Sequence, residues 1–144
     1  MYQIIEYEEK YLDKAIDFWL KIYVDEYGIK EWTNGIKNTF TENNFWNLFI
    51  AIDKEDNIVG TIGIKKYNNE VEIKRLCVKK DARGQGVAKK LLNVAEEYIK
   101  EKGIRHVFLY TTKKLENAVV FYDRSGFEIC EFVNENVVKY EKKL

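Results

Sequence analysis

Two glycines lie in a strongly basic stretch, between an apolar strand-like run and a helix-like pattern. The turn reads Arg83-Gly84-Gln85-Gly86, and the charged residues around it are Lys79, Lys80, Asp81, Lys89 and Lys90. Glycine lets the main chain turn several N–H groups toward one point, and the first N–H groups of a helix have no internal partner. Together with the helix dipole, these groups can bind a phosphate. The alternative is an ordinary helix start with a solvated basic face.

Three phosphate-binding motifs compete for this turn. A P-loop requires Lys and then Ser or Thr after its second glycine, whereas Val87-Ala88 follows Gly86, so a P-loop is excluded. A dinucleotide fingerprint requires a third Gly or Ala where Lys89 stands, and an opening strand near the N-terminus. The pattern that remains is R-x-x-G-x-A, from Arg83 to Ala88.

The spacing of apolar residues predicts the elements that position this turn. A first strand is expected at Gln3–Tyr7, a helix between Leu12 and Tyr27 that stops at Gly28, and a weaker helix within Thr33–Asn43. An antiparallel meander of strands follows, at Trp46–Ile52, Ile58–Lys66 and Val71–Val78. The remaining elements are a helix from Val87 to Gly103, a strand at Val107–Thr111, a short helix at Ala118–Arg124, and a hairpin of Phe127–Phe132 with Val137–Tyr140.

The predicted order is β-α-α-β-β-β-α-β-α-β-β, an α/β fold with a mixed, mostly antiparallel sheet. A right-handed crossover through the helix after the turn makes Val71–Val78 and Val107–Thr111 parallel. Ligands of such sheets bind at the carboxyl ends of the parallel strands. The glycine turn lies at one of these ends.

The length of 144 residues suits one domain, expected to span residues 1–144. Because 24 Lys and Arg balance 24 Asp and Glu, nucleic acid is not an expected partner. The inventory of Cys77, Cys130 and His106 does not assemble a usual zinc site, so no metal is expected. The N-terminus lacks the pattern of a signal peptide and no run is long enough to span a bilayer, so a soluble, cytoplasmic protein without membrane association is expected.

The R-x-x-G-x-A pattern resembles the acyl-CoA-binding motif of the GNAT superfamily, the N-acetyltransferases that use acetyl-CoA. Glu72–Val78 resembles the fourth strand of that family, and Asn117–Phe127 resembles its second motif, ending in F-Y-x-x-x-G-F. The expected element order is also that of the family, so the resemblance covers nearly the whole chain. It implies a GNAT-like fold in which the central parallel strands splay apart.

The resemblance also implies how acetyl-CoA is held. The main-chain N–H groups of the turn bind the pyrophosphate, and the pantetheine arm lies like an extra strand between the splayed strands. The N–H near Leu76 then faces the thioester oxygen and stabilises the oxyanion. The implied cofactor-binding residues are Leu76, Cys77, Val78, Arg83, Gly84, Gln85, Gly86, Val87, Ala88, Lys89 and Asn117. Asn117 departs from the family spacing, in which Leu115 would be the asparagine.

Two side chains are catalytic candidates by the same resemblance. Tyr122 is the candidate general acid that returns a proton to the departing CoA thiolate, against the alternative of a tyrosine packed beside Phe121. Glu72 is the candidate general base for the acceptor amine, against the alternative of a solvent-facing strand residue. Strict alternation places Glu72 on the face of Leu76 and Val78, unless a bulge intervenes. Cys77 and His106 are expected to be structural.

The predicted function is direct transfer of an acetyl group from acetyl-CoA to a primary amine in a ternary complex. A catalytically silent acyl-CoA sensor and a transferase with another acyl donor are the alternatives. The acceptor is expected between the first helices and the final hairpin, where acidic and aromatic residues suit a cationic amine; these are Trp19, Tyr23, Asp25, Glu26, Tyr27 and Trp32. The same aromatic residues also fit the core face of the first helix. A homodimer is compatible with the resemblance.

Overall fold

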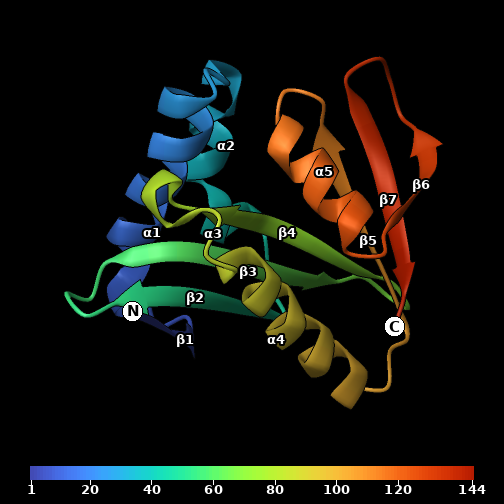
Figure 1. Cartoon of the computed structure of the whole chain (residues 1–144), viewed down its shortest axis with the longest axis horizontal. Coiled ribbons are helices and arrows are strands. Elements are labelled where there is room, and N and C mark those ends of the chain that lie inside the picture. Colours follow the sequence, from blue (N-terminus) through green and yellow to red (C-terminus); the bar gives the residue numbers. More distant parts are fainter.

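A seven-stranded mixed sheet forms the centre of the computed structural model, which describes residues 1–144 (Figure 1). Its strands lie in the order β1-β2-β3-β4-β5-β7-β6. Their bounds are β1 Tyr2–Glu6, β2 Asn47–Asp53, β3 Ile58–Lys66, β4 Val71–Val78, β5 His106–Thr112, β6 Glu128–Phe132 and β7 Val137–Lys143. The helices are α1 Leu12–Trp19, α2 Thr33–Lys37, α3 Thr39–Glu42, α4 Val87–Glu101 and α5 Glu116–Arg124.

The predicted order of elements is confirmed, except that the helix expected within Thr33–Asn43 is divided into α2 and α3, and most other ends lie within one to three residues of the predicted ones. The first helix has a feature that the spacing did not predict, because α1 continues as a π-helical segment over Leu20–Glu26. Gly28 follows in the left-handed region with φ 70°, as expected for the residue after a helix. No helix combines the length and the apolar character that crossing a bilayer requires.

The sheet divides between β4 and β5. Strands β1 to β4 pair antiparallel, each with its neighbour, and β7 inserts between β5 and β6 as a second antiparallel group. The two groups meet through the parallel pair β4–β5, whose register contains only Glu72 opposite Phe108. The prediction of splayed central parallel strands is therefore confirmed, and the strands diverge beyond Glu72.

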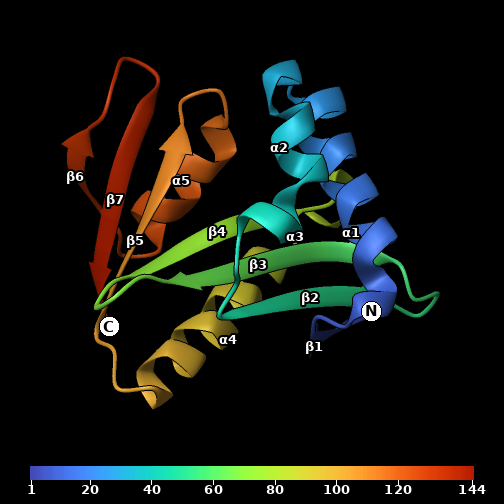
Figure 2. The same cartoon turned by 180° about the vertical axis from the view of Figure 1, so that it is seen from behind.

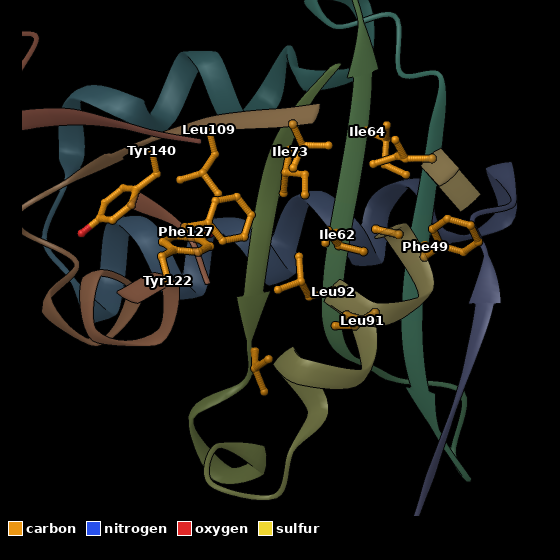
Figure 3. Packing of buried hydrophobic residues seen from close by; sticks show 14 of the residues in the cluster. Phe49, Ile62, Ile64, Ile73, Leu91, Leu92, Leu109, Tyr122, Phe127 and Tyr140 are labelled. Carbon is orange, nitrogen blue, oxygen red and sulfur yellow. The ribbon is translucent and has the colours of Figure 1, made fainter. Parts of the chain in front are cut away.

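Helices cover the two faces of the sheet separately. The amphipathic helix α4 lies on one face, where Leu91, Leu92 and Ile99 pack against Ile62 and Ile64 (Figures 1 and 3). On the other face, α1 to α3 cover β2 and β3 around a second apolar cluster that includes Trp19, Ile36 and Ile50 (Figure 2). The α4 face thus carries the crossover helix and the other face carries the N-terminal helices.

A β-bulge in β4 reverses the alternation of its side chains. Arg75 has φ 56°, a left-handed conformation that is uncommon without glycine, and the β3–β4 register shifts between Thr61 and Gly63. Before the bulge Val71 and Ile73 belong to the cluster under α4, and after it Leu76 and Val78 do. Glu72 therefore points to the opposite face from Leu76 and Val78. The prediction from strict alternation is wrong, and the bulge is the reason.

Candidate active site

A cavity of about 580 Å³ lies where the diverging end of β4 meets the first turn of α4. The first helical segment, β4, the glycine turn and α5 all contribute to its wall. The residues that line it are Ile22, Tyr23, Tyr27, Leu76, Cys77, Val78, Ala82, Arg83, Gly84, Gly86, Val87, Ala88, Lys89, Leu115, Asn117, Ala118, Phe121 and Tyr122. Ten of the eleven cofactor-binding residues predicted from the sequence, and Tyr122, therefore line one cavity. Gln85 and Glu72 do not line it.

The glycine turn presents unpaired main-chain N–H groups at the start of α4. Gly84 and Gly86 have φ of +80° and +79°, and a Cβ added at either would meet nothing within 4 Å. Their conformation, rather than crowding, therefore requires glycine. Gly86 is the N-cap of α4 without a side-chain cap, and none of the loop and cap hydrogen bonds is donated by an N–H between Gly84 and Lys89. These amides are free to bind an anion.

The side chain of Arg83 is occupied by the protein itself. Its Nη2 donates to Glu26 Oε1 at 2.8 Å, its Nη1 to the other carboxylate oxygen, and its Nε to the main-chain oxygen of Val78 at 2.9 Å. The guanidinium also lies over the ring of Tyr27, 5.7 Å from its centroid. Arg83 thus joins the end of the first helical segment to β4, and binding of a phosphate at this turn depends on the main chain.

The end of β4 supplies main-chain groups to the cavity. Cys77 and Val78 pair with Thr61 and Gly60 of β3 on one side, and no residue of β5 pairs with them on the other. Leu76, Cys77 and Val78 all line the cavity. An extended chain of a ligand can therefore form strand-like hydrogen bonds to this segment of β4.

Tyr122 reaches the cavity from α5 and is held by other aromatic rings. Its ring centroid lies 5.6 Å from that of Phe121, 5.5 Å from Phe127 and 5.9 Å from Tyr140 (Figure 3). The side chain is only 6% exposed. Burial, and secondarily the neighbouring Cys77, raises the pKa of Tyr122 well above its ordinary value, so the hydroxyl stays protonated at neutral pH.

Glu72 lies at the point where β4 and β5 begin to diverge, outside the cavity and on the other face of the sheet. Its carboxylate is buried and accepts a hydrogen bond of 2.7 Å from the hydroxyl of Tyr67. Burial, followed by this hydrogen bond, raises the pKa of Tyr67 to about 12. The structure therefore places the two catalytic candidates on opposite sides of the diverging strands rather than together in one cavity.

Gln85 is the one proposed cofactor-binding residue of the turn that does not line the cavity. Its side chain turns back to donate to the main-chain oxygen of Asp81 at 3.3 Å. The wall has seven further residues, of which Tyr23 and Tyr27 were expected for the acceptor, and sequence reasoning missed Ile22, Ala82, Leu115, Ala118 and Phe121. Those of α5 and its approach adjoin the recognised motif, whereas the residues near the first helix became recognisable only through the packing of that helix across β4.

Of the acidic and aromatic residues named for the acceptor, Tyr23 and Tyr27 line the cavity, whereas the others do not. Trp19 is fully buried and donates to Thr61 Oγ1 at 2.9 Å, so it belongs to the core. Tyr23 is 5% exposed and lies against Trp32, with 5.3 Å between ring centroids. The carboxylate of Glu26 is engaged by Arg83. Trp19 therefore belongs to the core face of the first helix, and Tyr23 belongs both to this core face and to the cavity wall.

The two remaining candidates for reactive chemistry have ordinary environments. The thiol of Cys77 lies 3.6 Å from Thr61 Oγ1, and burial raises its pKa, which disfavours a thiolate. His106 lies 3.2 Å from a carboxylate oxygen of Glu141 on the exposed surface. No group of three or more His, Cys, Asp and Glu side chains is arranged to hold a metal ion.

Comparison with known proteins identifies the family. The sequence model of the Acetyltransferase (GNAT) family matches residues 7–127. The spermidine N(1)-acetyltransferase of Thermoplasma acidophilum is 27% identical over 136 residues, which cover 91% of this chain and 80% of that protein. Several other curated N-acetyltransferases match over 27–54% of their own length.

Solved structures show the same fold over the whole chain. An acetyltransferase of the GNAT family from Staphylococcus aureus Mu50 superposes with a TM-score of 0.87 at 29% identity, covering 100% of this chain and 99% of that one. The PaiA N-acetyltransferase of Thermoplasma acidophilum, solved in complex with coenzyme A, gives a TM-score of 0.77 at 22% identity, with 100% and 99% covered. This chain is therefore an N-acetyltransferase that belongs to the acetyltransferase (GNAT) family.

Proposed function

We propose that this protein binds acetyl-CoA in the cavity beside the glycine turn and transfers the acetyl group directly to a primary amine. One observation carries the proposal: unpaired amides at the start of α4 and the unpaired edge of β4 open into the same cavity. A volume of about 580 Å³ is in the range of small-molecule sites. The complex of the Thermoplasma PaiA N-acetyltransferase with coenzyme A supports the choice of ligand.

The residues present fit the chemistry of acetyl-CoA. The amides from Gly84 to Lys89 would hold its pyrophosphate, and Lys89 adds a positive charge at the cavity wall. The main chain of Leu76 to Val78 would bind the pantetheine arm, and Asn117, which also lines the cavity, would donate to it. Acetyl-CoA supplies the activated acetyl group, and the protein supplies position and proton transfer.

The transfer uses a base and an acid. Their candidates, Glu72 and Tyr122, lie on the two sides of the diverging strands. Glu72, directly or through a water molecule, takes a proton from the acceptor ammonium, so that the free amine can attack. The amine adds to the thioester carbon, and the C–S bond then breaks as the proton on Tyr122 passes to the sulfur of the leaving CoA. The nitrogen of the new amide gives up its excess proton to water, and exchange with water restores Glu72 and Tyr122. The opposite placement of Glu72 and Tyr122 suits a reaction in which the amine and CoA approach the same carbon from different sides.

The proposal is tested by calorimetry with acetyl-CoA and with CoA, followed by a panel of amines with release of free CoA thiol as the readout. Binding of both with micromolar affinity and turnover of at least one amine are expected. The absence of any heat with either compound at high protein concentration would refute it.

A silent acyl-CoA-binding module is the second candidate, and the burial of Glu72 beneath Tyr67 favours it. A sensor would bind acetyl-CoA and release no thiol with any amine. The Tyr122→Phe variant separates the two candidates. An enzyme should lose rate while it still binds acetyl-CoA, whereas a sensor has no turnover to lose.

A further inference from the structure

The face of the sheet opposite α4 carries a basic group of side chains around Glu72. In the strand register Lys65 lies opposite Glu72, and Glu72 opposite Phe108. One step further along the same face, Lys74 stands on β4 and Tyr110 on β5, on either side of the diverging strands, with Lys139 of β7 opposite Tyr110. We call Lys65, Lys74, Arg75 and Lys139 the basic group.

None of these cations is neutralised by the protein. The seven ion pairs of the chain include no member of the basic group. Lys65 lies over the ring of Tyr67 at 5.2 Å and Lys139 over that of Phe108 at 4.6 Å. Lys74 donates only to the neutral Asn43 Oδ1, at 3.1 Å.

Arg75 is the most constrained member of the basic group. Its guanidinium carbon lies 5.6 Å from the ring centroids of both Trp19 and Tyr23, and its Nη2 donates to Thr39 Oγ1 at 3.1 Å. Its Nε is buried without any partner. The Nε is closed off from a ligand, whereas Nη1 makes no hydrogen bond and is not fully buried, so the half-buried guanidinium keeps one accessible donor for an anion.

The carboxylates of this face do not balance the basic group. Glu72 is the one buried carboxylate, and its hydrogen bond is to the neutral Tyr67. Glu141 is paired with His106, and Glu131 is the β6 neighbour of Lys139 but forms no ion pair with it. Burial lowers the pKa of Lys74, and the charges of Lys65 and Arg75 lower it further, whereas Glu72 opposes them. The cations therefore repel one another across this face.

We propose that the acceptor is an amine that also carries a carboxylate or phosphate, with the amine at Glu72 and the anionic group among Lys74, Arg75 and Lys139. The inference rests on the proposed function, because it assigns this face to the acceptor. A charge-assisted hydrogen bond from Nη1 of Arg75 would hold the anionic group, and the lysines would add attraction. A diamine or polyamine would instead bring a second positive charge into a region that already repels cations.

Two probes with the same number of carbon atoms test which sign of charge is favoured on the second functional group of the acceptor. These are 4-aminobutyrate and 1,4-diaminobutane, which differ in a carboxylate against an ammonium group; ethanolamine phosphate and ethanolamine test the phosphate arm. The measurements are kcat/KM from thiol release, and calorimetric binding of each probe to the protein saturated with CoA. We expect an anionic probe to exceed its matched partner by about 10- to 100-fold in both measurements.

The variants remove lysine charges either from the basic group or from the opposite face of the sheet. The double variant Lys74→Gln and Lys139→Gln should lower kcat/KM for the anionic probe by about tenfold or more and leave the dissociation constant of acetyl-CoA unchanged. Lys66→Gln is the matched control, because Lys66 follows Lys65 in β3 but lies over Trp46 on the α4 side, and it should change neither value.

The outcomes separate this inference from the proposed function. The anionic acceptor is refuted if turnover or binding favours the diamine. It is also refuted if the double variant has the same kcat/KM as the wild type for both probes. In either case the proposed transferase function still stands. Acetyl-CoA binding without turnover or binding of any probe overturns it as well. No heat with acetyl-CoA overturns the proposed function itself.

Discussion

Deleting one hydroxyl from Tyr122 separates catalysis from folding. In Tyr122→Phe the ring keeps its contacts with Phe121, Phe127 and Tyr140, because only the oxygen is removed. General acid catalysis contributes about 10²- to 10⁴-fold, so kcat should fall by that factor. At 1.36 kcal/mol per tenfold, this is about 2.7–5.5 kcal/mol of barrier.

The stability of the Tyr122→Phe variant should not fall together with its kcat. The Tyr122 hydroxyl makes no side-chain hydrogen bond within the protein and is not one of its fully buried unpaired polar atoms, because Tyr122 lines the cavity. Since the substitution breaks no hydrogen bond and keeps the ring contacts, the free energy of unfolding should stay close to that of the wild type. The dissociation constant of acetyl-CoA, measured by calorimetry, should be unchanged, because the phosphate-binding amides are untouched.

Tyr140→Phe is the matched control. Tyr140 is fully buried and its ring is 5.9 Å from that of Tyr122, but its hydroxyl donates to Asp123 at 3.0 Å and it does not line the cavity. This variant should lose about 1 kcal/mol of stability in chemical denaturation and keep its kcat. The reasoning is refuted if Tyr122→Phe retains kcat within about threefold of the wild type, or if both variants lose rate equally.

The remaining predictions concern the glycines, the base and pH. Gly86→Ala should weaken acetyl-CoA binding in calorimetry by about 5- to 30-fold, because a left-handed φ costs a residue with a Cβ about 1–2 kcal/mol; Gly35→Ala, in α2 with nothing within 4 Å, is the control that should not change it. Gly60→Ala should cost about 1–3 kcal/mol in denaturant unfolding, because its Cβ would come within 2.9 Å of a side-chain carbon of Leu91; unaltered stability would contradict this. Glu72→Gln should lower kcat/KM by about 10²-fold near neutral pH and regain activity as the pH rises and free amine accumulates; a constant deficit at all pH values would argue against a base. Because the pKa of Tyr122 is raised in the fold, the folded protein keeps a proton that the unfolded chain loses above about pH 10, so stability should fall as pH rises past that point, and less steeply in Tyr122→Phe.

The parts of the fold that the sequence could predict are those encoded by local patterns. The apolar stripe of α4, the glycines before it and the strand at Val71–Val78 each depend on near neighbours in the chain, and their bounds in the structure agree. The F-Y-x-x-x-G-F motif singled out Tyr122 for the same reason, and this residue lies in the cavity wall. Backbone conformation at the glycine turn followed from the residue type alone.

The parts that were missed depend on contacts distant in sequence. Arg75 carries a left-handed φ although nothing in its residue type requires it, so the bulge that moved Glu72 to the other face had no local signal. The engagement of Arg83 by Glu26 spans 57 positions and uses the carboxylate that seemed available to an acceptor. The insertion of β7 between β5 and β6 likewise depends on how the hairpin docks as a whole.

The single paired position between β4 and β5 has a consequence for the protein's solubility. A sheet that parts in its middle gains open edges, and open edges invite strands from other chains to join them. Here α4 packs against β4 and α5 against β5, and the unpaired end of β4 lines the cavity (Figure 1). The main-chain groups that would promote aggregation at an exposed edge therefore face a cavity, where a bound ligand can pair with them.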